Sequence, residues 1–196
     1  AALVRSIPPQ SHLLLVGDAD QLPSVGSGNV LKDLIVSKLF KVTRLAVTFR
    51  QAEDSGIVGL AHGILEGKTS PPLPLDHPSG LNPQHDVHFI RANSPEECVS
   101  HITLLLKEIL PKKFSIDPNN NVQVLAPLHR GIAGIGNLND QIRDSINPHG
   151  ATHSMGFNLF REGDRVIQTR NNYDKDVFNG DMGIIDSVDS INGKIE

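Results

Sequence analysis

The feature that most constrains this chain is an apolar run ending in a polar turn, within Leu13 to Gly28. Its apolar residues predict a strand over His12 to Val16, and a Gly-Asp pair ends that strand. Apolar residues at helical spacing follow over Asn29 to Lys38 and predict a helix. A strand that leads through a polar turn into a helix is the building unit of α/β sheets.

The same alternation continues along the chain as far as about residue 150. A proline-rich segment, Ser70 to Gln84, interrupts it and is expected to be a surface loop. Strands predicted to alternate with helices favour an α/β fold with a parallel sheet flanked by helices. The further elements predicted here are a strand at Lys41 to Val47, a helix from Ile57 to Leu65 that Gly67 ends, a strand at Asp86 to Arg91, a helix capped by Ser94, and a strand at Val122 to Leu125.

The helix after Ser94 has the clearest start signal. Pro95 suits the first helical position, and Glu97 completes the pattern of a capping box. The lone cysteine, Cys98, begins an apolar stripe and is expected on a core face. One cysteine excludes an internal disulfide framework and fits a reducing cytosol.

After Pro148 the pattern changes to short strands separated by turns. Asn179-Gly180 and Asn192-Gly193 are hairpin-turn signals, and they predict an all-β meander that forms a small barrel. Only three residues follow Gly193, which we expect to be too few for a returning strand. The chain is therefore expected to be a piece of a longer protein. The strands predicted here are Asp164 to Thr169, Asp176 to Phe178, Gly183 to Val188 and a stub at Lys194.

Charge and hydropathy argue against a broad basic surface for nucleic acid and against a membrane-spanning segment. With 18 Lys and Arg against 22 Asp and Glu, the 196 residues carry a net charge of −4, so any contact with DNA must be local. No apolar run approaches the roughly 20 residues that span a bilayer. A cytoplasmic protein without membrane contact is expected.

Two residues carry the predicted chemistry. Gln21 follows the Gly17-Asp18 strand end, where ligands of parallel sheets bind, and its amide can both donate to a phosphate oxygen and accept from water. Arg50 stands in an uncharged neighbourhood and offers a guanidinium suited to a transferring phosphoryl group. The alternatives are a simple turn stabilised by Asp18 and an ion pair of Arg50 with nearby Glu53 or Asp54.

Other candidate sites are rejected on spacing. Gly63 to Thr69 imitates a phosphate-binding loop but has one residue too few between its glycines, so Gly67 is interpreted as a helix C-cap and Lys68 as solvated. His85 and His88 would point to opposite faces of a strand, and His149 and His153 are expected in loops. No metal site is predicted.

The ordered set of motifs resembles RecD-like DNA helicases of superfamily 1, also called the exodeoxyribonuclease V alpha subunit family. The resemblance extends over nearly the whole chain. It is carried by Leu13 to Gly28, Asn29 to Ile35, Phe49 to Ala52, Ser55 to His62, Val124 to Gly131, Leu138-Asn139, Gly163 to Gln168, Asn171 to Tyr173 and Val177 to Gly183.

The resemblance implies an ATP-dependent 5′ to 3′ DNA helicase in recombination and repair. Residues 1–47 would end a first RecA-like motor domain, 48–150 would form part of a second, and 151–196 would be a truncated barrel like a Src-homology-3 domain. Gln21, Arg50 and Asp18 would be catalytic, and Gly17 would join Gln21 and Arg50 at the nucleotide. ATP and Mg²⁺ would be used by the full-length protein and would not bind tightly to this segment, which lacks a phosphate loop.

The resemblance also implies single-stranded DNA as a partner, and other subunits of a helicase–nuclease complex. The expected DNA contacts combine loop and strand-end positions with side chains suited to phosphates and bases. They are Ser24, Val25, His129, Arg130, Asn139, Arg170, Asn171, Asn172 and Tyr173.

Two other classes of function remain open at the level of sequence. One is a non-enzymatic module that binds DNA or protein. The other is an unrelated nucleotide-binding enzyme such as a small kinase, which would need the Gly63 to Thr69 loop to hold phosphate. A phosphate-loop lysine and an acidic pair upstream of Ala1 would favour the helicase.

Overall fold

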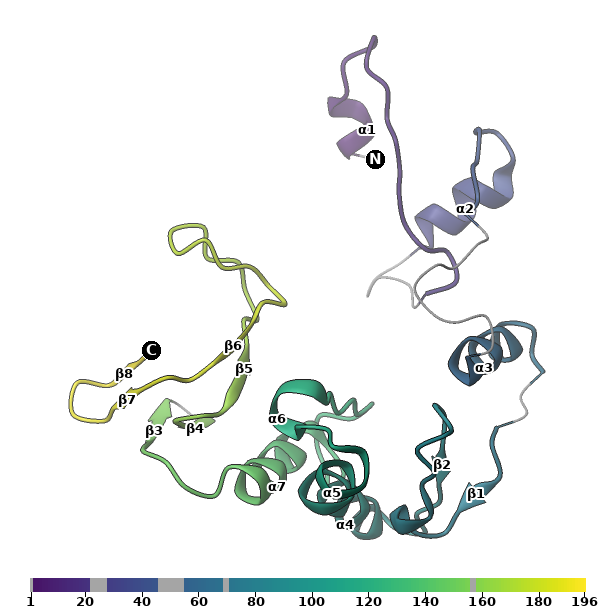
Figure 1. Cartoon of the computed structure of the whole chain (residues 1–196). Helices are drawn as coiled ribbons and strands as arrows, with labels where there is room; N and C mark the ends of the chain where they lie inside the picture. The colour runs from purple at the N-terminus through teal and green to yellow at the C-terminus, as the bar shows by residue number, and fades with distance from the viewer. Residues whose placement is uncertain (1, 22–27, 46–54, 69–70, 156–157) are drawn as a thin grey trace. The chain divides into compact units, whose positions relative to one another are not determined.

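The computed structural model describes residues 2–21, 28–45, 55–68, 71–155 and 158–196. The chain divides into two compact units, Ala1–Ser70 and Pro71–Glu196. Figure 1 shows the elements of both units along the chain.

The described residues of the first unit form three helices, α1 (Ala2–Ser6), α2 (Val30–Ser37) and α3 (Gly56–Leu65). The predicted helices at Asn29 to Lys38 and Ile57 to Leu65 are thus confirmed. The strand predicted over residues 12–16 is not formed in the described part of this unit, and neither is one over residues 41–45. A strand exists only where a neighbouring strand accepts its hydrogen bonds, and the described residues give these two segments no such ladder.

The second unit begins with a short parallel pair, β1 (Pro74–Leu75) and β2 (Phe89–Ile90). Of the predicted strand at Asp86 to Arg91 only Phe89–Ile90 is formed, while β1 lies inside the segment expected to be a loop. A 3₁₀ turn, η1 (Pro78–Gly80), connects the two strands. A larger parallel sheet is absent from the described residues, because residues 122–125 carry no strand pairing.

A helical run over residues 95–114 follows as α4 (Pro95–Leu104), the π-helical η2 (Leu105–Ile109) and α5 (Leu110–Phe114). The Ser94 hydroxyl accepts from the Glu97 N–H, as predicted. Pro111 has no N–H, and its ring collides with the carbonyl four residues earlier, so the helix widens just before it. The predicted core stripe is confirmed: Leu106 is buried and Cys98 half-buried.

Two further helices complete the α-helical part, α6 (Pro118–Asn121) and α7 (Ile135–Ile146). Helix α7 was not predicted from the sequence, although Ile135, Leu138 and Ile142 lie at helical spacing on it. Helix α7 contacts α4 and η2, and its Leu138 is buried.

The last part of the chain consists of three antiparallel hairpins. They pair β3 (Thr152–Met155) with β4 (Asn158–Arg161), β5 (Arg165–Ile167) with β6 (Met182–Ile184), and β7 (Val188–Asp189) with β8 (Lys194–Ile195). The all-β character predicted after Pro148 is confirmed. Residues 176–178 form no strand beyond an isolated bridge from Asn172 to Val177.

The three residues after Asn192-Gly193 were expected to be too few for a returning strand, but this strand does form. Val188 pairs with Ile195, and Asp189 pairs with Lys194. The Asp189 carboxylate accepts from the Asn192 amide at 2.6 Å and from the backbone N–H groups of Asn192 and Ile191 at 3.0 Å each. Two residues therefore suffice for the second strand, because one carboxylate stabilises the turn.

Helix α7 is joined to the hairpins by a polar network. Arg143 donates to the Leu159 carbonyl at 2.9 Å, and Arg161 donates to the Asp144 carboxylate at 3.1 Å. The Asn147 amide donates to the Glu162 carbonyl and to the Asp164 carboxylate, at 2.9 and 2.8 Å. The network fixes α7 against β4 and the turn that follows it.

Candidate functional site

The turn that carries Gln21 is organised by the carboxylate of Asp18. One oxygen accepts the backbone N–H of Asp20 at 2.9 Å, and the other accepts the Gln21 side-chain amide at 3.0 Å. The predicted turn role of Asp18 is therefore observed, and the same group holds the side chain expected to act on phosphate. These hydrogen bonds lower the pKa of the exposed Asp18, first through Asp20 and then through Gln21.

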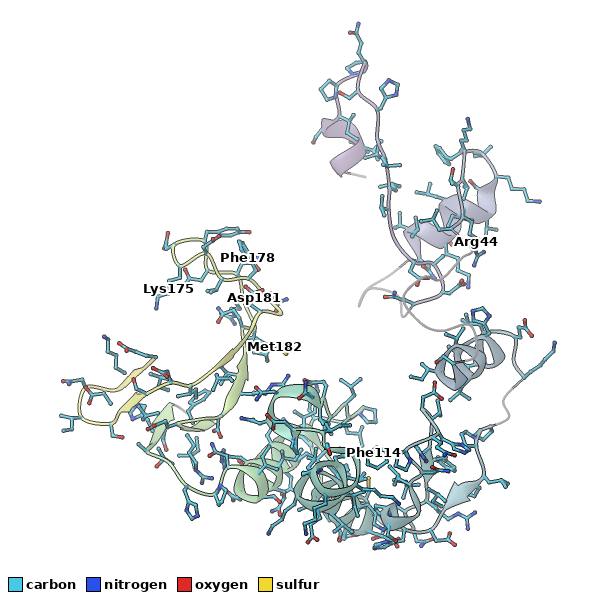
Figure 2. The ribbon with its side chains drawn as sticks, viewed as in Figure 1. Arg44, Phe114, Lys175, Phe178, Asp181 and Met182 are labelled. Atoms are coloured by element: carbon cyan, nitrogen blue, oxygen red, sulfur yellow. The ribbon has the colours of Figure 1, made fainter. Side chains whose placement is uncertain are left out.

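Arg44 contacts this turn from a segment later in the same unit. Its guanidinium donates to the Asp20 carboxylate at 2.5 Å, and Figure 2 labels its side chain. Sequence reasoning missed Arg44, since nothing local in the sequence reveals a partner 24 residues away.

Gly17, predicted at the nucleotide, lies where helix α2 approaches the turn. A Cβ added to it would stand 2.9 Å from Leu31 Cδ2. The absence of a side chain therefore allows the Leu31 side chain of α2 to lie close to the backbone just before Asp18.

Three predicted site residues, Ser24, Val25 and Arg50, lie outside the described residues. The expected convergence of Gln21 and Arg50 on one terminal phosphate therefore remains a prediction.

The sequence that imitates a phosphate loop is the end of a helix. Helix α3 ends at Leu65, Gly67 follows with a φ of +70°, and the Lys68 N–H returns to the Gly63 carbonyl at 2.7 Å. The Lys68 ammonium lies 3.1 Å from the Glu66 carboxylate. The C-cap interpretation is confirmed. The kinase alternative is not supported, because α3 ends where that site needs a helix to begin.

His129 and Arg130 lie exposed in a tight loop that leads into α7. The Ile135 N–H donates to the Leu128 carbonyl at 2.9 Å, and the Gly134 N–H donates to Gly131 at 3.0 Å. Asn139 is exposed on α7 itself. The loop and this helix thus carry three of the predicted DNA contacts.

Gly134 is the residue on which the shape of this loop depends. A Cβ there would lie 2.6 Å from the backbone carbon and oxygen of Arg130. Gly134→Ala is expected to lower the free energy of unfolding by about 1–3 kcal/mol, because backbone must move. The matched control is Gly136→Ala, whose Cβ would meet no atom closer than 3.8 Å, and which is expected to be neutral or stabilising in urea unfolding. Equal stabilities of the two variants would contradict this account.

The other four predicted DNA contacts gather in the loop between β5 and β6. The Asn171 side chain accepts the Asn179 N–H at 2.8 Å and donates to the Tyr173 hydroxyl at 3.2 Å. Asn172 and Val177 exchange backbone hydrogen bonds. Tyr173 is 77% exposed, and its ring meets that of Phe178 edge-on, with centroids 6.1 Å apart. Arg170 is also exposed, and its carbonyl accepts from Gln168 at 2.6 Å.

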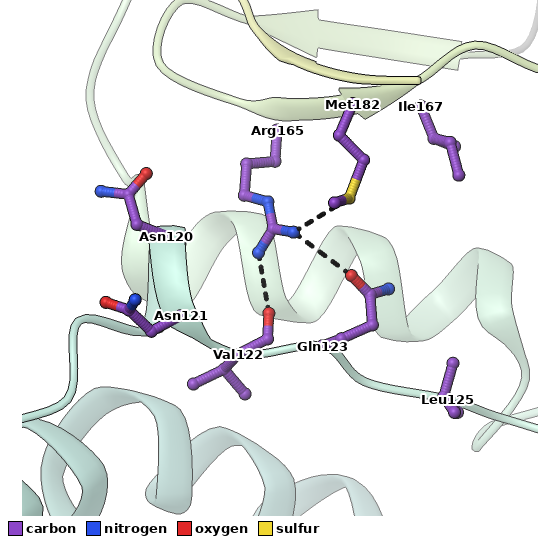
Figure 3. Close-up of a pocket in the computed structure, with 8 residues that line it drawn as sticks. All are labelled: Asn120, Asn121, Val122, Gln123, Leu125, Arg165, Ile167 and Met182. Atoms are coloured by element: carbon purple, nitrogen blue, oxygen red, sulfur yellow. Dashed lines mark hydrogen bonds between the residues drawn. The ribbon is translucent and has the colours of Figure 1, made fainter. Parts of the chain in front are cut away.

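A shallow pocket of about 430 Å³ lies beside this hairpin and was not predicted. Arg165 crosses it and donates to the Val122 carbonyl at 2.8 Å and to the Gln123 amide oxygen at 3.3 Å (Figure 3). The guanidinium also lies 3.2 Å from the Met182 sulfur. Arg165 thereby holds the extended segment after α6 against β5 and β6.

The histidine pairs differ from expectation. The rings of His85 and His88 lie 6.1 Å apart rather than on opposite faces of a strand, because the segment forms a turn in which His88 accepts the Asn82 N–H at 3.0 Å. His149 lies in a loop as predicted, whereas His153 lies in β3. Within the described ranges, no group of three or more His, Cys, Asp or Glu side chains could hold a metal ion. None of the helices described there is long and apolar enough to cross a membrane.

Two families match separate parts of the chain. Residues 138–196 match the family described as the ATP-dependent RecD-like DNA helicase SH3 domain. Residues 1–91 match the AAA domain family. The first match covers most of α7 and all three hairpins.

Curated relatives match over 94% of the chain. The chain is 30% identical over 184 residues to the ATP-dependent RecD2 DNA helicase of Deinococcus radiodurans, covering 94% of this chain and 23% of that protein. It is 27% and 26% identical to the RecBCD enzyme subunit RecD of Mycolicibacterium smegmatis and of Mycobacterium tuberculosis, covering 94% of this chain and 33% of each relative.

The chain thus spans from 23% to 33% of the length of these relatives. The family matches at its two ends and the relatives along its length agree with the ordered motifs found in the sequence. The chain is thus similar to RecD-like helicases over 94% of its length.

Proposed function

We propose that this chain is the central part of an ATP-dependent DNA helicase that moves 5′ to 3′ along single strands during recombination and repair. The observation that carries the proposal is the similarity over 94% of the chain to a protein named as a DNA helicase. The Asp18–Gln21 turn supports it, because its side chains are of the types that sense a terminal phosphate.

In this proposal Gln21 and Arg50 act on the same terminal phosphate from two motor domains, residues 1–47 and 48–150. Gln21 would keep one amide N–H on Asp18 and donate the other to a phosphate oxygen, while its amide oxygen orients water. Arg50 would neutralise charge that develops on the transferring group. Gly17 would contribute its backbone to the nucleotide site, and Ser24 and Val25 would carry the signal from Gln21 to DNA.

The described residues do not fit the remainder of an ATP and Mg²⁺ site. Lys68 is paired with Glu66 beyond the end of a helix, and it offers phosphate no helix N-terminus. We therefore propose that the full-length protein supplies the phosphate loop and the magnesium carboxylates, and that the 196-residue segment alone does not hydrolyse ATP.

DNA would be bound by the loops around α7 and by the hairpin of β5 and β6. His129, Arg130 and Asn139 would contact the strand from the second motor domain. Residues 151–196 would close as a barrel like a Src-homology-3 domain and would present Arg170, Asn171, Asn172 and Tyr173. We also propose that the protein works in the cytoplasm and, as in relatives named as RecBCD subunits, with helicase–nuclease partners.

Tyr173→Ala is expected to weaken binding of a single-stranded oligonucleotide by about 1–3 kcal/mol, because an exposed ring offers a face on which a base stacks. Fluorescence anisotropy with the full-length protein measures the effect. Tyr173→Phe keeps the ring and serves as the control. Unchanged affinity in the alanine variant would remove Tyr173 from the DNA-binding surface.

The function is tested by assaying the full-length protein for ATP hydrolysis and unwinding. We expect hydrolysis that single-stranded DNA stimulates, and unwinding of a duplex with a 5′ tail but not of one with a 3′ tail. DNA binding without hydrolysis would instead favour a non-enzymatic module. Unwinding from the 3′ tail would contradict the proposed direction.

A further inference from the structure

We infer that Arg44 is a positioning residue for Gln21, an assignment that rests on the proposed function. Four residues form a relay, which we call the Arg44 latch: Arg44 binds the Asp20 carboxylate, Asp18 accepts the backbone N–H of Asp20, and Asp18 also accepts the amide of Gln21. All four residues belong to the first unit.

Each of the two carboxylates in the latch has its own hydrogen-bond partners. Asp18 uses one oxygen for the Asp20 N–H and the other for Gln21. Asp20 turns its carboxylate toward Arg44. The guanidinium therefore restrains the turn at its centre, and the carboxylate of Asp18 transmits that restraint to the side chain of Gln21.

The latch contributes little to global stability. The Arg44 side chain is 73% exposed and that of Asp20 is 43% exposed. Ion pairs in such positions stabilise a protein by about 0–1 kcal/mol. Its effect is instead expected on geometry, since a misplacement of about 1 Å can reduce a catalysed rate by about 10²-fold.

The test uses the full-length protein with Arg44→Gln, Asp20→Asn and the double variant. Each single variant is expected to lower DNA-stimulated kcat about 5- to 10-fold, with KM for ATP and the melting temperature unchanged. The double variant should lose no more than either single one, because both remove the same contact. The exchange Asp20→Arg with Arg44→Asp should recover part of the rate, and Lys41→Gln, an exposed cation of the same segment, should match the wild type.

An active wild type with an unchanged Arg44→Gln variant overturns the latch and leaves the helicase proposal intact. A wild type without ATPase activity overturns the helicase proposal instead. In that case the latch is tested by the position of the Gln21 amide in a nucleotide-free crystal structure of the Arg44→Gln protein. A Gln21 amide displaced from Asp18 supports the latch, and one that stays on Asp18 overturns it.

Discussion

Arg50→Ala in the full-length protein is expected to reduce kcat for DNA-stimulated ATP hydrolysis by about 10³-fold or more. A guanidinium places two parallel donors on a transferring phosphoryl group, and no neighbouring side chain of the motif replaces it. Steady-state hydrolysis with saturating single-stranded DNA measures the loss. Nucleotide affinity should change little, since the contact strengthens as charge develops.

Two further variants make that result specific. Arg50→Lys keeps the positive charge but loses the paired N–H donors of the guanidinium, and it should recover only part of the rate. Arg5→Ala removes an exposed arginine of α1 and should leave kcat unchanged. If Arg50→Ala turns over within about twofold of the wild type while its circular dichroism is normal, the arginine is an ordinary ion-pair partner of Glu53 or Asp54.

Gln21→Ala is expected to produce the second-largest effect, a loss of about 10²-fold in DNA-stimulated turnover. The amide is the group that the Asp18 carboxylate holds at the turn, so its removal leaves the turn intact and eliminates the phosphate contact. Binding of a fluorescent ATP analogue should persist. The measurement is the ratio of hydrolysis with and without single-stranded DNA.

Gln10→Ala, a change to another exposed glutamine of the same unit, is the matched control and should keep the full stimulation. Equal stimulation in Gln21→Ala and in the wild type would show that the residue serves the turn alone.

Helix starts and ends could be predicted because their causes are local. Ser94 accepts from a residue three positions later, and Gly67 adopts its positive φ directly after the last turn of α3. Both signals are contained in fewer than ten consecutive residues. The same holds for Asp18 and Gln21, whose contact spans three residues.

Strands and long-range contacts could not be predicted in the same way. Residues 12–16 and 122–125 have the composition of strands but no ladder partner among the described residues, whereas β8 forms from two residues because β7 lies opposite. Arg44 reaches a partner 24 residues away, and Arg165 reaches one 43 residues away. Such pairings depend on how distant segments pack, and a single sequence does not encode them in any short pattern.

The most direct test of the central claim is the distance of two side chains from one phosphate. A crystal structure of the full-length protein with a non-hydrolysable ATP analogue and single-stranded DNA would supply it. The account predicts the Gln21 amide and the Arg50 guanidinium within about 3 Å of oxygens on the terminal phosphate. If either group lies well beyond hydrogen-bonding distance and faces away from the nucleotide, the account is contradicted.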